Sequence, residues 1–168
     1  MANNTAALQV AAALLSGGES SRLHQSLVYR QRIASQAGFE ADFRVGPGLL
    51  SAYAMAAGSQ SLDRLSTALL AEVRRLARQP IAPAELAKVK TQMLTQALAS
   101  RQTPNGLASA LADAAVLEGD AAQADRALAA LQAVTAADVR RVVQQYLLRP
   151  HRVRLDYTQA AGPKKGTP

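Results

Sequence analysis

Residues 39–57 have the sequence FEADFRVGPGLLSAYAMAA, and this stretch decides the fold class. In its first seven residues apolar side chains alternate with charged ones, which is the period of a strand with one buried face and one solvated face. The apolar positions are Phe39, Ala41, Phe43 and Val45, and the charged positions are Glu40, Asp42 and Arg44. Gly46-Pro47-Gly48 then predicts a turn, and residues 49–57 predict a partner strand. The stretch therefore predicts a β-hairpin that begins after a break at Gly38.

Outside this hairpin the chain has the composition and the period of packed helices. Of its 168 residues 49% are hydrophobic, and alanine, the strongest helix former, supplies 37 of them. The clearest helical pattern runs from Leu62 to Leu76, where leucine and valine recur every three or four residues. Weaker patterns of the same kind predict helices over about 5–15, 21–32, 83–97, 107–117, 122–133 and 135–146.

After Pro150 the alternation returns, with His151, Val153, Leu155 and Tyr157 separated by charged residues, and it predicts a last strand. The fold class is therefore α+β. We expect an antiparallel sheet, made of the hairpin plus a C-terminal strand, covered by about six to seven helices. We expect residues 1–158 to form a single lobe and the Gly/Pro-containing residues 159–168 to form a disordered tail.

Composition excludes several kinds of site. The chain contains no cysteine, which excludes disulfides, thiolate-bound zinc and thiol nucleophiles. The formal net charge is +7, and a basic chain is a candidate for binding nucleic acid. The basic residues are spread over both halves of the chain, which argues against a concentrated nucleic-acid footprint.

Motifs for catalysis are also missing from the sequence. The two histidines, His24 and His151, have no second histidine or carboxylate at metal-ligand spacing, and neither H-E-x-x-H nor H-x-x-E-H occurs. There is no G-x-S-x-G nucleophile motif, and the segment GGESS at 17–21 lacks the lysine of a phosphate loop. The residues of this chain therefore predict no catalytic site, metal site or cofactor site.

Five segments, in order, resemble the insulinase/pitrilysin family of zinc peptidases. They are LLSGGESSRL at 14–23, LVYRQRIA at 27–34, the strand pair at 39–58, IAPAELAKVK at 81–90, and the segment from VTAADV to YL at 134–147. The resemblance covers roughly residues 6–158. Chains of this family usually hold two related α+β lobes, of which the first binds zinc through H-x-x-E-H and the second closes over the substrate.

This resemblance implies a non-catalytic C-terminal lobe with the fold of a metallopeptidase lobe and without its leading strand or strands. The zinc is then expected in another lobe of the same protein or in a partner subunit, so that this chain alone is inactive. The expected partners are that catalytic lobe and a peptide substrate, not nucleic acid. An unpaired strand would also favour self-association of copies of this chain.

Some family members hold the substrate with an R-x6-Y pair, whose positions fall at Val28 and Ser35 here and do not match. Arg30 and Arg32 lie close by and are the candidates for facing a peptide in the chamber, although an exposed helix end also explains them. The resemblance to exported bacterial relatives favours the periplasm, with the cytoplasm as the alternative. Two other functions stay open: a stand-alone basic α+β module that binds protein or nucleic acid, and a structural subunit without peptidase activity.

Overall fold

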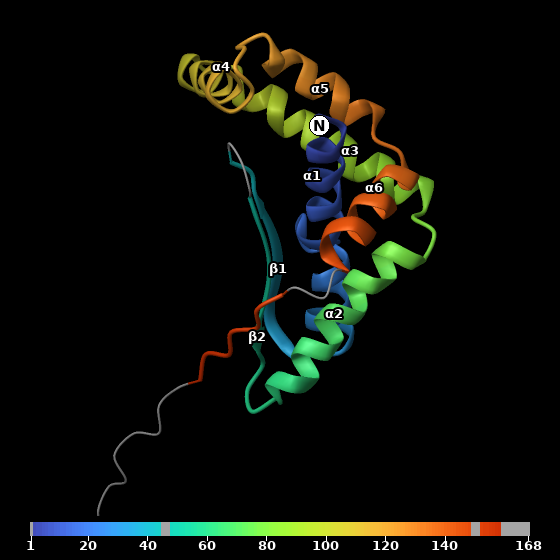
Figure 1. Ribbon diagram of the computed structural model, residues 1–168. Helices are drawn as coiled ribbons and strands as arrows, with labels where there is room; N and C mark the ends of the chain where they lie inside the picture. Colours follow the sequence, from blue (N-terminus) through green and yellow to red (C-terminus); the bar gives the residue numbers. More distant parts are fainter. Residues whose placement is uncertain (1, 45–47, 149–151, 159–168) are drawn as a thin grey trace, which may run out of the picture.

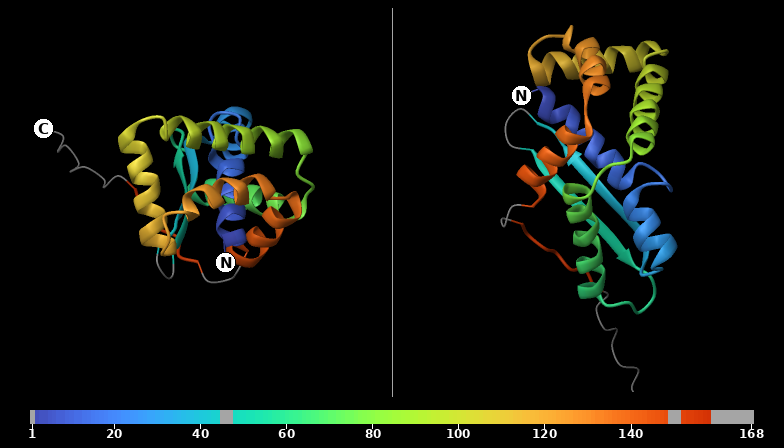
Figure 2. Two further views of the ribbon diagram at one scale, coloured as in Figure 1. Left: turned by 90° about the horizontal axis from the view of Figure 1, so that it is seen from above. Right: turned by 90° about the vertical axis from the view of Figure 1, so that its right-hand side faces the viewer.

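The computed structural model describes residues 2–44, 48–148 and 152–158. These residues form a two-stranded antiparallel sheet with helices gathered on one of its faces, while the other face is bare (Figures 1 and 2). The α+β class predicted from the hairpin and the helical periods is confirmed. No helix in the described part of the chain is long and apolar enough to cross a membrane.

Ten elements follow one another along the described chain. They are α1 (Ala2–Ser16), the π-helix η1 (His24–Arg30), β1 (Ala34–Asp42), β2 (Leu49–Ala56), α2 (Leu62–Arg78), α3 (Pro83–Ser100), α4 (Pro104–Glu118), α5 (Gln123–Ala133), α6 (Ala136–Val142) and the π-helix η2 (Val143–Leu147).

Helix α1 is the centre of the core. It contacts β1 on one side and α3, α5 and α6 on the others, so that it lies between the sheet and the outer helices (Figure 1). Leu14 and Leu15 are both fully buried although they are neighbours and point in different directions. A helix that is apolar all round is stable only when it is surrounded, and each buried leucine contributes roughly 1.5–3 kcal/mol.

Helix α2 has one buried face, as its period predicts. Leu65, Leu69, Val73 and Leu76 are all buried. Ser61 caps the helix by accepting a hydrogen bond from the backbone N–H of Arg64 at 3.5 Å, and Arg75 and Arg78 lie in the last turn, where positive charge favours the helix dipole. The buried face of α2 packs against β2, η1, α6 and η2.

The hairpin begins earlier than the sequence predicts. Strand β1 starts at Ala34, five residues before Phe39, and Gly38 lies inside the strand instead of breaking it. The pairing joins Phe39 to Ala52 and Gly38 to Tyr53. The Tyr53 ring lies across Gly38, where a Cβ atom would be only 2.5 Å from the Cζ atom of the ring. The glycine therefore makes room for a cross-strand aromatic side chain. Val45 lies outside the described residues.

The predicted C-terminal strand does not form. Residues 152–158 are extended, but none of them pairs with a strand, and the sheet in the described chain consists of β1 and β2 alone. Alternation of apolar and charged residues favours an extended backbone, but pairing with a strand also depends on where the tertiary structure places the segment. The predicted disordered tail at 159–168 and His151 lie outside the described residues.

Candidate functional site

The helices leave one face of the hairpin uncovered (Figures 1 and 2). Successive side chains of a strand point to opposite faces, so the register shows which residues share this face. On β1 they are Gln36, Gly38, Glu40 and Asp42, and on β2 they are Leu49, Ser51, Tyr53 and Met55. We call these eight residues the open sheet face. One row carries two carboxylates, and the other row carries exposed apolar and aromatic side chains.

The opposite face of the same hairpin closes the core. Phe39 is buried there, and Ala37, Ala41, Leu50 and Ala54 pack against the core cluster. Small side chains on this side let α1 and α2 approach the strands closely. The hairpin therefore covers the core with one face and exposes the other, the open sheet face, to solvent.

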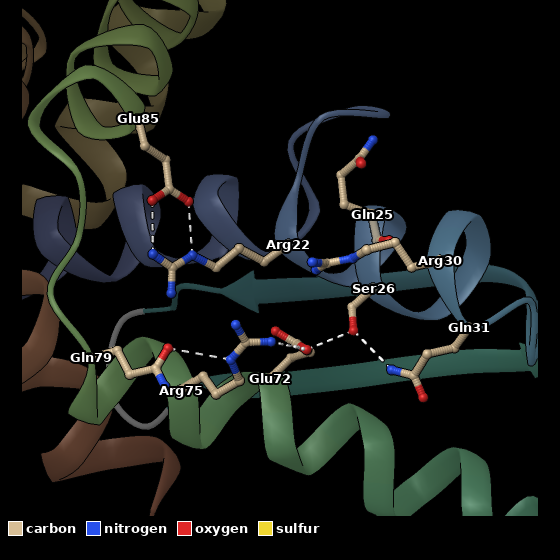
Figure 3. Close-up of polar contacts among 9 residues, drawn as sticks. All are labelled: Arg22, Gln25, Ser26, Arg30, Gln31, Glu72, Arg75, Gln79 and Glu85. Carbon is tan, nitrogen blue, oxygen red and sulfur yellow. Dashed lines mark hydrogen bonds and ion pairs between the residues drawn. The ribbon is translucent and has the colours of Figure 1, made fainter.

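Arg30 and Arg32, the two candidate substrate-facing residues, lie at the end of η1 where the chain turns into β1. Both are exposed. The Nε atom of Arg30 donates a hydrogen bond to the backbone oxygen of Gln25 at 3.1 Å, which holds the side chain back along the helix (Figure 3). Arg32 has a positive φ of 51°, which is uncommon for a residue other than glycine. Their contact with a substrate stays a prediction.

A partly buried polar cluster lies between η1 and α2, and none of the residues predicted from the sequence belongs to it. The hydroxyl of Ser26 donates to Glu72 Oε1 at 2.6 Å, and it accepts from the side-chain amide of Gln31 at 2.9 Å. Arg75 donates to the same oxygen of Glu72 at 2.9 Å (Figure 3). A buried carboxylate needs such partners, because an unpaired one would lose its hydration without compensation. The cluster ties η1 to α2.

A sequence signal for this cluster exists in α2. Glu72 lies three residues after Leu69 and four before Leu76, which places a carboxylate within the apolar stripe of the helix. A carboxylate at such a position either reaches solvent, because the helix is rotated, or is paired with a polar partner in the interior. The spacing does not say which partners it has, because Ser26 is 46 residues away in the chain.

A second ion pair joins the segment before η1 to the start of α3. Arg22 Nε and Nη2 donate to the two carboxylate oxygens of Glu85, each at 2.8 Å (Figure 3). These hydrogen bonds hold the pKa of Glu85 below its ordinary value of 4.5. The pair connects two of the segments that carry the family resemblance, 14–23 and 81–90.

Neither arrangement has the parts of a catalytic centre. Ser26 in η1 and Glu72 in α2 are both buried, so a substrate cannot reach the hydroxyl. The ring of His24 is occupied with the backbone oxygen of Glu19, 2.9 Å from Nδ1. Within residues 2–44, 48–148 and 152–158 no three histidine or carboxylate side chains come together as a metal site.

One hollow adjoins the tip of the hairpin. It has a volume of about 540 Å³ and lies between α1, the end of β1 and the helices α3, α4 and α5. Its apolar walls include Ala12, Phe43, Met93 and Leu128. The polar residues Gln9, Ser100, Arg101 and Asp113 also line it, so apolar and polar side chains share its walls.

The fold is shared with solved structures of bacterial proteases. The inactive peptidase domain of a candidate zinc protease from Bordetella parapertussis superposes with a TM-score of 0.84 at 24% identity, over 96% of this chain and 87% of that chain. A candidate zinc protease from Bordetella pertussis Tohama I gives a TM-score of 0.77 at 24% identity, over 88% of this chain and 81% of that one.

A longer relative shows how much of a whole protease this fold represents. A protease from Helicobacter pylori superposes with a TM-score of 0.79 at 23% identity, over 86% of this chain but only 35% of its own. The chain therefore spans about a third of the length of that protease. Identities at this level show a common fold and nothing finer.

The sequence profile described as the peptidase M16 inactive domain matches residues 2–93, which is more than half of the chain. No curated protein matches the chain significantly. The matched residues include α1, η1, the hairpin and α2, which are the elements that build the core and the open sheet face. The resemblance seen in the sequence is confirmed, and the chain belongs to the M16 peptidase family as its inactive, non-catalytic domain.

Proposed function

We propose that this chain is the non-catalytic lobe of a zinc metalloendopeptidase and that its open sheet face forms one wall of the substrate chamber. The observation that carries the proposal is the asymmetry of the hairpin, whose inner face closes the core and whose outer face is bare. In an inactive domain of a peptidase family, a rigid wall with an accessible face can bind and confine a substrate without performing chemistry.

The zinc in this proposal belongs to another lobe or subunit. The composition of this chain supports a zinc site outside it, because the sequence contains no H-E-x-x-H, no H-x-x-E-H and no cysteine. When bound in its own lobe, zinc supplies Lewis acidity and an activated water. The residues of the present chain would confine the peptide and exclude bulk water from it.

The experiment that tests the proposal is reconstitution. The 168-residue chain is assayed alone and then together with a chain that carries H-x-x-E-H from the same genome, using a quenched fluorescent peptide. We expect no turnover by the chain alone and turnover by the pair above that of the catalytic chain alone. A catalytic chain whose activity does not change when this chain is added would overturn the proposal.

Arg30 and Arg32 are tested within the same assay. We propose that both face the peptide, so Arg30→Gln and Arg32→Gln should raise KM and leave kcat nearly unchanged. Glutamine carries a Cβ atom as arginine does, so the backbone strain from the positive φ at position 32 is the same in the variant. Arg126→Gln on α5 is the matched control, because Arg126 is exposed and lies on a different element. If the three variants had equal KM values, the prediction that Arg30 and Arg32 contact the peptide would be wrong.

The competing function, a basic module that binds nucleic acid, makes a different prediction. Such binding would weaken steeply between low and moderate salt, because cations released from the phosphates drive it. A filter-binding or fluorescence assay measures nucleic-acid binding at two salt concentrations. Binding that weakens steeply with salt would favour the nucleic-acid module, and no binding would favour the peptidase lobe.

We also propose that the protein works in the periplasm. Cell fractionation decides this: recovery of the protein with cytoplasmic markers would contradict it.

A further inference from the structure

The open sheet face has a net charge of opposite sign to that of the whole chain. The chain has a formal net charge of +7. The eight residues of the open sheet face include two carboxylates, Glu40 and Asp42, and no lysine, arginine or histidine. A surface of one charge sign attracts ligands of the other sign. This face therefore favours a positively charged ligand, although the chain as a whole is basic.

One of the two carboxylates already binds an arginine of the chain itself. Arg44 Nε donates a hydrogen bond to Asp42 Oδ2 at 2.8 Å, and Arg44 Nη2 donates to the same oxygen. Glu40 lies two residues earlier on the same face and is exposed. Among the described residues no group donates a hydrogen bond to its carboxylate, and its cross-strand neighbour is the small Ser51. The face therefore presents the Glu40 carboxylate to a ligand.

The side chain of Tyr53 lies next to Glu40 and presents one face of its ring to solvent. Tyr53 pairs with Gly38, and Glu40 is the next residue after Gly38 on this face of β1. A Cβ atom on Gly38 would lie 2.5, 2.6 and 2.6 Å from the Cζ, Cε1 and Oη atoms of Tyr53. Nearly equal distances to three connected atoms place that point above the ring plane, so the ring covers the glycine with one face. The other face is directed to solvent, in agreement with the 47% exposure of Tyr53.

We propose that Tyr53 and Glu40 form a subsite for an arginine side chain of a peptide bound to the open sheet face. A guanidinium is planar, so it can stack on the outer face of the Tyr53 ring while its N–H groups donate to the Glu40 carboxylate. Gly38 allows this arrangement, because a larger residue there would displace the ring. Leu49 and Met55, exposed in the same row as Tyr53, favour apolar residues beside the arginine. The inference rests on the proposed function, since it takes this face to be the wall that meets the peptide.

Binding of two peptides to the full chain tests the subsite. The first is a short peptide with one central arginine between leucines, and the second has citrulline, a neutral isostere, in place of the arginine. The isotope-labelled chain is titrated with each peptide, and its backbone amide signals in NMR spectra report affinity and location. We expect the arginine peptide to bind about tenfold more tightly and to shift the signals of residues 38–42 and 51–55. Equal affinities, shifts confined to other elements, or no binding of the arginine peptide at millimolar concentration would overturn the inference.

Variants of the chain assign the preference to the two side chains. Glu40→Gln and Tyr53→Leu should each weaken binding of the arginine peptide about threefold and affect the citrulline peptide less, because each removes one contact with the guanidinium. Tyr53→Phe keeps the ring and should bind as the wild type does. Glu118→Gln is the matched control, since Glu118 is exposed on α4, and it should change neither affinity. An arginine preference that is unchanged in either Glu40→Gln or Tyr53→Leu would overturn the inference.

The same two peptides separate this inference from the proposed function in the reconstitution assay. If turnover rises when this chain is added but is equal for the two peptides, the proposed function stands and the arginine subsite is wrong. If the arginine peptide binds more tightly at residues 38–42 and 51–55 but turnover does not rise, the subsite is supported and the proposed function is wrong.

Discussion

Arg22 and Glu85 form a two-point ion pair, with Nε–Oε1 and Nη2–Oε2 distances of 2.8 Å, between positions 63 residues apart in the chain. Their side chains are 17% and 28% exposed, so the pair is partly shielded from water. It joins the segment after α1 to the first turn of α3. The pair therefore holds the turn between α1 and η1 against the start of α3.

Replacing Arg22 by lysine should lower the free energy of unfolding by about 1 kcal/mol, because an ammonium cannot make the parallel pair of hydrogen bonds. Urea unfolding measures the change. Arg44→Lys is the matched control: both side chains of its ion pair with Asp42 are exposed, so its loss should change stability much less than the loss of the Arg22 pair. If both substitutions lowered the free energy of unfolding equally, the Arg22–Glu85 pair would stabilise the fold no more than an exposed ion pair does.

The same pair predicts how stability depends on pH. The hydrogen bonds from Arg22 lower the pKa of Glu85 in the folded chain below its ordinary value of 4.5. A lowered folded pKa means that the contribution is fully present above the unfolded pKa and is lost as the pH falls through the folded pKa. Melting temperatures of the wild type and Glu85→Gln should therefore differ most above pH 4.5 and converge in more acidic solution. If the difference in melting temperature between the two proteins did not change with pH, the lowered pKa of Glu85 would be contradicted.

Two buried serines should respond in opposite ways to the same substitution. Among the described residues Ser21 Oγ is buried without a hydrogen-bond partner, whereas Ser26 Oγ donates to Glu72 and accepts from Gln31. Ser21→Ala should be neutral or stabilising by up to about 1 kcal/mol, since it removes an unsatisfied group. Ser26→Ala should cost about 2–3 kcal/mol, because it deprives a buried carboxylate of a partner. Thermal unfolding of both variants checks the contrast, and a destabilised Ser21→Ala would refute it.

The contact of Tyr53 with Gly38 predicts a coupled pair. Gly38→Ala places a Cβ atom 2.5 Å from the present position of the tyrosine ring, so the exposed ring must swing aside. We expect a cost of about 1 kcal/mol in the wild type and nearly none in Tyr53→Ala, where the space is free. A double-mutant cycle measures the coupling. Additive effects would mean that the ring does not lie over the glycine in solution.

The sequence alone determined the fold class and the family. Local periods determined where α2 and the hairpin form, because an apolar residue every three or four positions, or every second one, needs one buried face whatever the partner is. The ordered segments from LLSGGESSRL to the VTAADV…YL region indicated the family, and a profile match over residues 2–93 shows it. The sequence also lacks the zinc motif H-x-x-E-H.

Only the tertiary structure decided which faces are bare and which distant residues meet. Residues 152–158 have the alternation of a strand but pair with none, because pairing depends on where the tertiary structure places a segment, which no local pattern encodes. Gly38 looked like a break, and only the crossing ring of Tyr53 explains it inside β1. Glu72 stood within an apolar stripe, but Ser26, its partner, lies 46 residues away. Local periodicity depends on neighbours along the chain, whereas edges, clusters and open faces depend on contacts between segments far apart in it.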